Sequence, residues 1–273
     1  MTLEMGNKEK ITPQNRFSTM ISPEPQIDSK RIEDTKSESH TTQKNSKKKN
    51  TNKFIYGNYN RYYGYRKGDK SDPRIKIFEG HSDLFSKKDI LDIGCNDGSV
   101  TLEIASKFEI NSITGIDIDK KLIGKAKNNT KFILKKNLNP NLLNVKFEVG
   151  NYIDEKNSST EIPRFDTILC LSVTKWIHLN FGDHGIKMMF KRIFAQLRDG
   201  GCLILEAQPF EGYRRRKKLT EDTLKNYKNM KLFPKDFKNY LFEIGFTHHY
   251  YINDPRDSKG FDRPIEVYVK QIS

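Results

Sequence analysis

The sequence predicts a doubly wound α/β fold, with a mostly parallel sheet of seven strands, helices on both faces and an antiparallel edge. Short apolar runs alternate with amphipathic stretches between residues 90 and 206, as in parallel strands that are joined by helices. Two later apolar runs are separated by a loop alone, which suits an antiparallel pair at one edge. A glycine-bearing turn after the first run is typical of a strand that leads into a helix.

Hydrophobic periodicity predicts where each strand and helix lies along the chain. Strands are predicted at 90–93, 112–117, 144–149, 165–171, 201–206, 247–252 and 265–270. Helices are predicted at 100–107, 120–137 and 185–197.

Composition divides the chain into a tail and a domain. The 273 residues include 49 Lys and Arg against 35 Asp and Glu, so the formal net charge is +14. Residues 1–53 are polar and basic and nearly lack large apolar side chains, so we expect a disordered tail. Residues 54–273 suit one domain. The basic run at 44–50 fits a nuclear import signal or an RNA-contacting arm, with a solvated tail as the alternative.

Simple counts exclude several protein classes. No apolar run is long enough to cross a bilayer, and the N-terminus lacks the apolar core of a secretory signal. Cys95, Cys170 and Cys202 are far apart and odd in number. This disfavours a disulfide scaffold or a zinc site, so we expect a reducing compartment and no metal. The basic charge favours a polyanionic partner, with nucleic acid first.

The segment 56–66 packs five tyrosines and two arginines into eleven residues. Tyrosine offers a flat face for stacking, and arginine offers a fork that matches phosphate. Either the segment contacts a nucleotide or phosphate over a site, or it is an aromatic latch on the domain. The residues alone do not choose between these two hypotheses.

The turn at 94–98 is the most specific local feature. Its Gly-x-x-x-Gly spacing lacks the second glycine that admits a dinucleotide pyrophosphate, so an adenosyl ligand without phosphates fits better. Asp117 ends the second strand, where a carboxylate can accept both hydroxyls of a ribose. Asn151 and Tyr152 follow the third strand, where the adenine would lie. Together these features indicate S-adenosylmethionine and methyl transfer, although a structural turn and a helix N-cap (better suited to Asp119) are the alternatives.

Polar residues after the fourth and fifth strands are candidates for the acceptor side. Lys175, Trp176 and His178 lie just beyond the fourth strand. Five consecutive cations at 214–218 follow Tyr213, and beside an active edge they would hold a polyanion. An exposed loop is the alternative reading of that run.

Seven motifs together resemble the bicoid-interacting-protein family of RNA methyltransferases. The likeness is greatest to the branch that methylates the γ-phosphate at the 5′ end of small non-coding RNAs, and it covers about residues 54–270. It implies the Rossmann-like seven-stranded S-adenosylmethionine-dependent methyltransferase fold. The motifs are YGNYNRYYGYR (56–66), LDIGCNDG (91–98), GIDID (115–119), GNY (150–152), LCLSVTKWIHLNFGD (169–183), EAQP (206–209) and KGFDRP (259–264).

The resemblance also implies the site residues. Contacts to S-adenosylmethionine, which leaves as S-adenosylhomocysteine, are expected from Tyr63, Arg74, Gly94, Cys95, Asn96, Asp117, Ile118, Asn151, Tyr152 and Leu171. The RNA 5′ end is expected among Tyr59, Tyr62, Arg66, Lys175, Arg214, Arg215, Arg216, Lys217 and Lys218. Lys175 and Arg66 are predicted to orient the phosphates. His178 is expected to be structural, because a phosphate oxygen is already an anion and needs no general base.

The same resemblance implies a small non-coding RNA with a 5′ triphosphate as substrate. Partners would be the RNA-binding proteins of the same ribonucleoprotein, in the nucleus or alternatively in the cytoplasm. Glu206-Ala-Gln and Phe210 depart from the family's usual Glu-Pro-Gln and tryptophan without a change of charge. Three alternatives stay open: a 5′-monophosphate methyltransferase, a non-catalytic RNA-stabilising subunit, and a methyltransferase for small molecules or proteins.

Overall fold

The computed structural model describes residues 54–59, 71–136, 140–154, 162–253 and 263–271. All of them lie in one compact unit, residues 48–273. The predicted tail at 1–53 lies outside the described residues. Among the described helices, none combines the length and the hydrophobicity that a membrane crossing requires.

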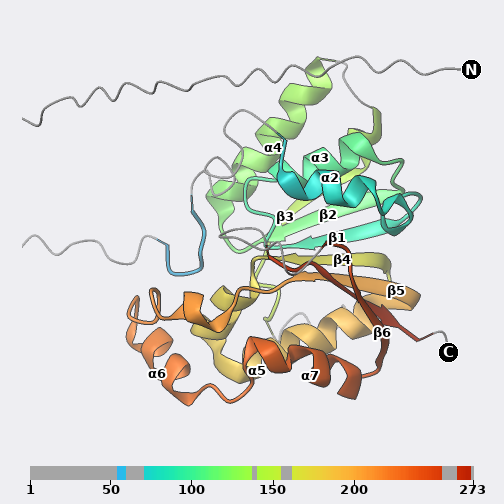
Figure 1. Ribbon diagram of the computed structural model, residues 1–273. Helices are drawn as coiled ribbons and strands as arrows, with labels where there is room; N and C mark the ends of the chain where they lie inside the picture. Colours follow the sequence, from blue (N-terminus) through green and yellow to red (C-terminus); the bar gives the residue numbers. More distant parts are fainter. Residues whose placement is uncertain (1–53, 60–70, 137–139, 155–161, 254–262, 272–273) are drawn as a thin grey trace, which may run out of the picture. The chain divides into compact units, whose positions relative to one another are not determined.

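A seven-stranded sheet forms the centre of this unit (Figure 1). The first five strands along the chain run parallel to each other. The seventh strand lies between the fifth and the sixth and is antiparallel to both of them. The predicted fold class is therefore confirmed, including its antiparallel edge. In the order of the sheet, the strands are β3 (Val145–Val149), β2 (Ser112–Asp117), β1 (Asp89–Ile93), β4 (Phe165–Leu171), β5 (Leu197–Glu206), β7 (Glu266–Lys270) and β6 (Phe246–Tyr251).

Helices cover both faces of the sheet (Figure 1). One face carries α2 (Pro73–Glu79), α3 (Ser99–Lys107) and α4 (Lys120–Lys135), and the other carries α5 (Thr174–Gln196) and α7 (Phe237–Glu243). The helix α6 (Glu221–Asn229) packs against α5. Short 3₁₀ turns are η1 (Ser82–Leu84), η2 (Pro140–Asn144), η4 (Phe210–Tyr213) and η5 (Pro234–Asp236).

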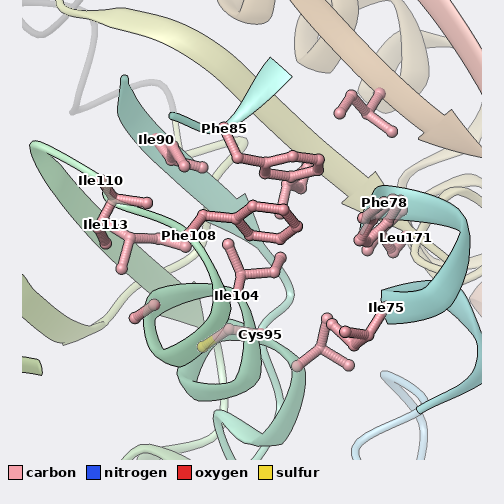
Figure 2. Close-up of a cluster of buried hydrophobic side chains, with 14 of the residues drawn as sticks. Ile75, Phe78, Phe85, Ile90, Cys95, Ile104, Phe108, Ile110, Ile113 and Leu171 are labelled. Carbon is pink, nitrogen blue, oxygen red and sulfur yellow. The ribbon is translucent and has the colours of Figure 1, made fainter. Parts of the chain in front are cut away.

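Two apolar clusters, one on each face, hold the helices to the sheet. Figure 2 shows part of the first, in which Phe78, Phe85 and Ile104 pack over the strands. The second joins Phe190 of α5 and Leu241 of α7 to the opposite face. Each fully buried side chain of this kind contributes about 1.5–3 kcal/mol. This burial fixes the strand ends, and with them the positions of the site residues.

The helix expected at 185–197 begins earlier, at Thr174. Gly182 adopts φ 64° and kinks the helix, which interrupts the apolar period on which the prediction rested. The following strand also begins earlier, at Leu197 rather than at residue 201. The helices α2, α6 and α7 were not predicted. A capping box of Thr220 and Thr223 begins α6, and this signal lies inside a highly polar stretch.

Candidate active site

A pocket opens at the carboxyl ends of the parallel strands, where open α/β sheets bind their ligands. Residues that follow β1, β2, β3 and β4 line it, and α5 closes one side. The lining residues are Tyr56, Gly57, Asn58, Ile93, Gly94, Asn96, Ile116, Asp117, Ile118, Gly150, Asn151, Tyr152, Leu171, Ser172, Val173, Trp176, Ile177 and Phe181.

The turn after β1 brings backbone close to this pocket. Gly94 has φ 71°, and a Cβ placed there would lie 2.5 Å from a Val173 methyl group. Asn96, two residues further along the turn, also takes a positive φ of 56°, which is uncommon outside glycine. Its backbone N–H donates to Asp117 Oδ2 at 2.9 Å. The turn therefore needs a glycine at 94, and it fixes the carboxylate at the end of β2.

Asp117 is a buried carboxylate that two backbone groups orient. Besides Asn96, the N–H of Asp119 donates to Oδ1 at 2.8 Å. Burial raises the pKa of Asp117, and these two hydrogen bonds oppose the rise. Each carboxylate oxygen has a second lone pair, so the pocket side of the group can still accept hydroxyl donors. Asp119 is the N-cap of α4, as the sequence suggested.

Residues 54–59, here called the strap, cross the pocket beside α5. Gly57 has φ 72°, and a Cβ there would overlap the Trp176 indole at 2.2 Å. Asn58 Nδ2 donates to Asp119 Oδ2 at 2.6 Å, which ties the strap to the start of α4. The described part of the tyrosine-rich segment therefore packs on the domain, as in the aromatic-latch hypothesis, and it also lines the pocket. Its contact with a nucleotide or phosphate stays a prediction.

Aromatic contacts fix the strap on its other side. Tyr56 stacks on Phe181, with ring centroids 6.4 Å apart, and Tyr59 meets Trp176 edge to face at 5.7 Å. The Arg216 guanidinium lies 5.4 Å from the Tyr59 ring centroid. The strap thus links the pocket to the cationic run at 214–218.

The start of α5 is held by Gln208, which follows β5. Gln208 is buried, and its Oε1 accepts from Thr174 Oγ1 at 3.0 Å and from the Lys175 N–H at 3.1 Å. Its Nε2 donates to the Ser172 carbonyl. Ser172 itself has φ 63°, a strained value that persists only where neighbours enforce it. One side chain therefore sets the backbone that carries Lys175.

Lys175 lies among cations beside the pocket. Its Nζ is 4.7 Å from the centroid of the Trp176 ring, and Trp176 lines the pocket. Burial, together with the charges of Arg263, Arg216 and Arg215, lowers the pKa of Lys175 to about 8. The pKa falls because this ammonium loses water and faces three like charges.

A buried carboxylate, Glu206, joins three chain segments behind this cluster. It accepts from Arg74 Nη1 at 2.8 Å, from Ser172 Oγ at 2.9 Å and from Arg263 Nη1 at 3.1 Å. Asp72 also pairs with Arg74, at 2.8 Å. A buried ion pair of this kind needs several partners to offset its desolvation. Glu206 thereby places Arg263 near Lys175.

His178 has the structural position that the sequence analysis expected. It is fully buried, and its Nε2 lies 2.8 Å from Asp183 Oδ1. Burial lowers the pKa of His178 more than Asp183 raises it. His178 does not line the pocket.

The structure brings together most of the predicted donor residues. Two of them lie elsewhere: Arg74 stands behind the pocket on Glu206, and the Cys95 side chain points into the apolar cluster of Figure 2. Tyr62, Tyr63 and Arg66 lie outside the described residues. The predicted donor residues that line the pocket are Gly94, Asn96, Asp117, Ile118, Asn151, Tyr152 and Leu171.

Of the predicted RNA residues, Tyr59, Lys175, Arg215 and Arg216 gather near the pocket. Arg214 and Lys218 are exposed beyond it, and Lys217 lies over the Tyr227 ring at 4.4 Å. The roles of Ser172, Gln208, Asn58 and Arg263 were not predicted. Gln208 lies in the motif EAQP and Arg263 lies in KGFDRP, but the spacing of residues in these motifs did not indicate what either side chain does.

Comparison with known proteins identifies the family. The model of the bicoid-interacting protein 3 family matches residues 165–270. The chain is 46% identical over 226 residues to the U6 snRNA methylphosphate capping enzyme Amus of Drosophila melanogaster, covering 80% of this chain and 75% of that protein. The chain belongs to the bicoid-interacting protein 3 family. It is also 36% identical to the human 7SK snRNA methylphosphate capping enzyme, covering 82% of this chain but 40% of the human protein.

Comparison with solved structures shows that this chain has a methyltransferase fold. A general methyltransferase-domain model matches residues 91–203. The N-methyltransferase NodS of Bradyrhizobium japonicum, in complex with S-adenosylhomocysteine, aligns with a TM-score of 0.54 and 14% identity, covering 80% of this chain and 98% of that one. The cofactor is S-adenosylmethionine, as predicted. The pocket fits it, because the Asp117 carboxylate lies beside backbone, amide and apolar groups, and none of the lining residues that the structure describes is a Lys, Arg or His that would bind a phosphate.

Proposed function

We propose that this protein methylates the 5′-terminal γ-phosphate of a small non-coding RNA, with S-adenosylmethionine as donor. The observation that carries the proposal is the cluster of Lys175, Arg215, Arg216 and Arg263 beside the donor pocket. Among the described residues, no carboxylate lies within ion-pair distance of Lys175, Arg215 or Arg216. Clustered cations that depress the pKa of a lysine favour a bound polyanion, which would neutralise them.

The pocket suits an acceptor that needs no deprotonation. The described lining residues include one carboxylate, Asp117, and two phenols, Tyr56 and Tyr152. Asp117 is held by two backbone groups, and Tyr152 donates its hydroxyl to Gln196 at 2.9 Å. A terminal phosphate has a second pKa near 6, so its oxygens are already anionic at neutral pH. An amine or a ribose hydroxyl would require a general base, and the lining residues that the structure describes do not offer one.

Catalysis by this chain is then mainly positioning. The bound donor supplies an electrophilic methyl group on its sulfonium sulfur. Asp117 and Asn151 would hold the adenosyl part, while Lys175 and Arg263 would grip the non-reacting phosphate oxygens. Held in this way, a γ-phosphate oxygen would take the methyl group, and the donor would leave as S-adenosylhomocysteine with the electron pair of the former carbon–sulfur bond. No proton moves, so correct alignment supplies most of the rate.

The names of the relatives support this choice of acceptor, since both are described as methylphosphate capping enzymes. The strap and the cation cluster add a physical reason, because Arg216 contacts Tyr59 at the mouth of the same pocket. The RNA-binding proteins of the substrate's ribonucleoprotein are proposed as partners, and the nucleus as the location, with the cytoplasm as the alternative.

The test uses methyl-labelled donor with three RNAs of one sequence that end in a 5′ triphosphate, a 5′ monophosphate or a 5′ hydroxyl. We expect label on the triphosphate RNA. Preferred labelling of the monophosphate RNA would assign the chain to the other phosphate chemistry, and equal labelling of the hydroxyl RNA would refute a phosphate acceptor. Donor binding without turnover on any of them would favour an RNA-stabilising role.

A further inference from the structure

A second basic surface lies on α4, on a different face from the cations around Lys175. This 16-residue helix contains no Asp or Glu. All six of its lysines are exposed, and we call them the α4 lysine face: Lys120, Lys121, Lys125, Lys127, Lys131 and Lys135.

The lysines share one side of the helix. At 3.6 residues per turn they span an arc of about 160°. The opposite side carries Leu122, Ile123, Ala126 and Thr130, which are buried. Only lysine, asparagine, glycine and one phenylalanine face solvent, so nothing on the helix balances the positive charge.

This arrangement works against the stability of the helix. Lys120 and Lys121 lie in the first turn, where the helix dipole disfavours cations. Lys127, Lys131 and Lys135 are spaced four residues apart, so like charges stand next to each other. A surface that served solubility alone would mix both signs of charge. The pattern is explained if a polyanion neutralises it.

An exposed aromatic ring lies within the same face. Phe132 is 59% exposed, and the Lys136 Nζ lies 4.3 Å from its ring centroid. It borders a shallow groove that α3 completes with Leu102 and Glu103. Aromatic faces among lysines are the combination that binds nucleic acid, because bases stack on the ring while phosphates meet the cations.

The lysine face begins at the rim of the donor pocket. Asp117 and Ile118 line the pocket, and Asp119 both caps α4 and accepts from Asn58 of the strap. From there the helix extends about 24 Å. Figure 1 shows α4 with α2 and α3 on the face of the sheet opposite α5 and α7. A ligand that starts at the pocket can therefore continue along α4.

We propose that the α4 lysine face binds the sugar-phosphate backbone of the RNA beyond its 5′ end, and that Phe132 stacks on an unpaired base. The choice of RNA as ligand rests on the proposed function. The surface itself is separate from the methyl-transfer site, so the two proposals are tested by different readouts.

The test compares Lys127→Gln/Lys131→Gln/Lys135→Gln with a matched control, Lys187→Gln/Lys191→Gln/Lys238→Gln. The control also removes three exposed lysines, but from α5 and α7 on the other face of the sheet. Binding of a hairpin RNA is followed by fluorescence anisotropy at several salt concentrations. Methyl transfer is measured in parallel on a 5′-triphosphate dinucleotide, which is too short to reach most of α4.

We expect the α4 variant to bind the hairpin roughly 10-fold or more weakly, with a smaller salt dependence, because phosphate contacts set that dependence. Its turnover of the dinucleotide stays at the wild-type level, and the control variant matches wild type in both assays. Equal hairpin affinity and salt dependence in the two variants would overturn the inference. Wild-type protein that fails to methylate the 5′-triphosphate dinucleotide would instead overturn the proposed function.

Two further measurements sharpen the result. Phe132→Ala should weaken hairpin binding several-fold without reducing the salt dependence, since stacking carries no charge. The second measurement is binding to vesicles rich in phosphatidylserine. If wild type binds these vesicles, and the α4 variant loses vesicle binding but keeps its hairpin affinity, the face would be assigned to an anionic membrane. That result would overturn the RNA proposal.

Discussion

In the proposed mechanism the pocket mouth has a donor half and an acceptor half, and different kinds of groups form the two. The donor half, at the ends of β1, β2 and β3, consists of backbone groups and short side chains such as Asp117 and Asn151. The acceptor half, beside β4 and β5, consists of long cations, with Lys175 and Arg263 ordered around Glu206 and Gln208. The donor half follows from the fold, whereas the acceptor half depends on side-chain contacts between distant segments. Variants should therefore affect the two halves independently.

The largest expected effect is that of Lys175→Ala. Loss of the cation that orients the phosphates should lower the rate of methyl transfer on the order of 10²-fold or more. The affinity for S-adenosylhomocysteine should stay unchanged in calorimetry, because Lys175 does not line the donor pocket. Lys175→Arg keeps the charge and should recover part of the rate. A near wild-type rate for the alanine variant would remove Lys175 from the acceptor half.

The reverse result is expected for Asp117→Ala. Loss of hydrogen bonds to a charged group should weaken S-adenosylhomocysteine binding about 10- to 100-fold. RNA affinity should be unaffected, since the carboxylate belongs to the donor half. Asp117→Asn retains one acceptor oxygen and should lose less. Parallel loss of RNA and donor binding in a folded Asp117→Asn protein would show that the halves are not separate.

Gln208 is a positioning residue for the acceptor half, and its substitution should have an intermediate effect. Gln208→Ala removes the acceptor that holds Thr174 and the Lys175 N–H, so kcat should fall roughly 10-fold by misplacement. Thr174→Val removes only one of these bonds and should cost less. If Gln208 had only a structural role, Gln208→Ala would lower the thermal stability of the protein and would leave kcat per folded molecule unchanged.

The smallest effect is a pH dependence of acceptor binding. The pKa of Lys175 is lowered to about 8, so the charged form that grips phosphate declines as the pH rises above this value. KM for RNA should increase a few-fold between pH 7.5 and pH 9. The sign for stability is opposite: the unfolded lysine keeps its proton up to about pH 10.4, so this group makes folding more favourable as the pH rises from 8 toward that value. Lys175→Ala should abolish both trends.

Most residues of the donor half could be located from sequence because they end a strand or follow one within a few residues. The apolar period located β2 through Asp117, and the glycine turn located Gly94 and Asn96. In the acceptor half, Gln208 acts through a bond to Thr174, 34 residues away, which no local pattern reveals. The start of α5 was missed because Gly182 breaks its period. Cys95 belongs to the glycine-turn motif, whereas Arg74 lies outside the seven motifs, and both side chains are buried away from the pocket.

The central claim is that one half of the pocket presents a methyl donor to a terminal phosphate held by the other half. Phosphorus NMR of a 5′-triphosphate dinucleotide, incubated with the protein and S-adenosylmethionine, tests it most directly. The account predicts that the γ-phosphorus alone shifts and gains coupling to methyl protons. Methyl groups found on the α-phosphate, on a ribose hydroxyl or on a base would contradict it.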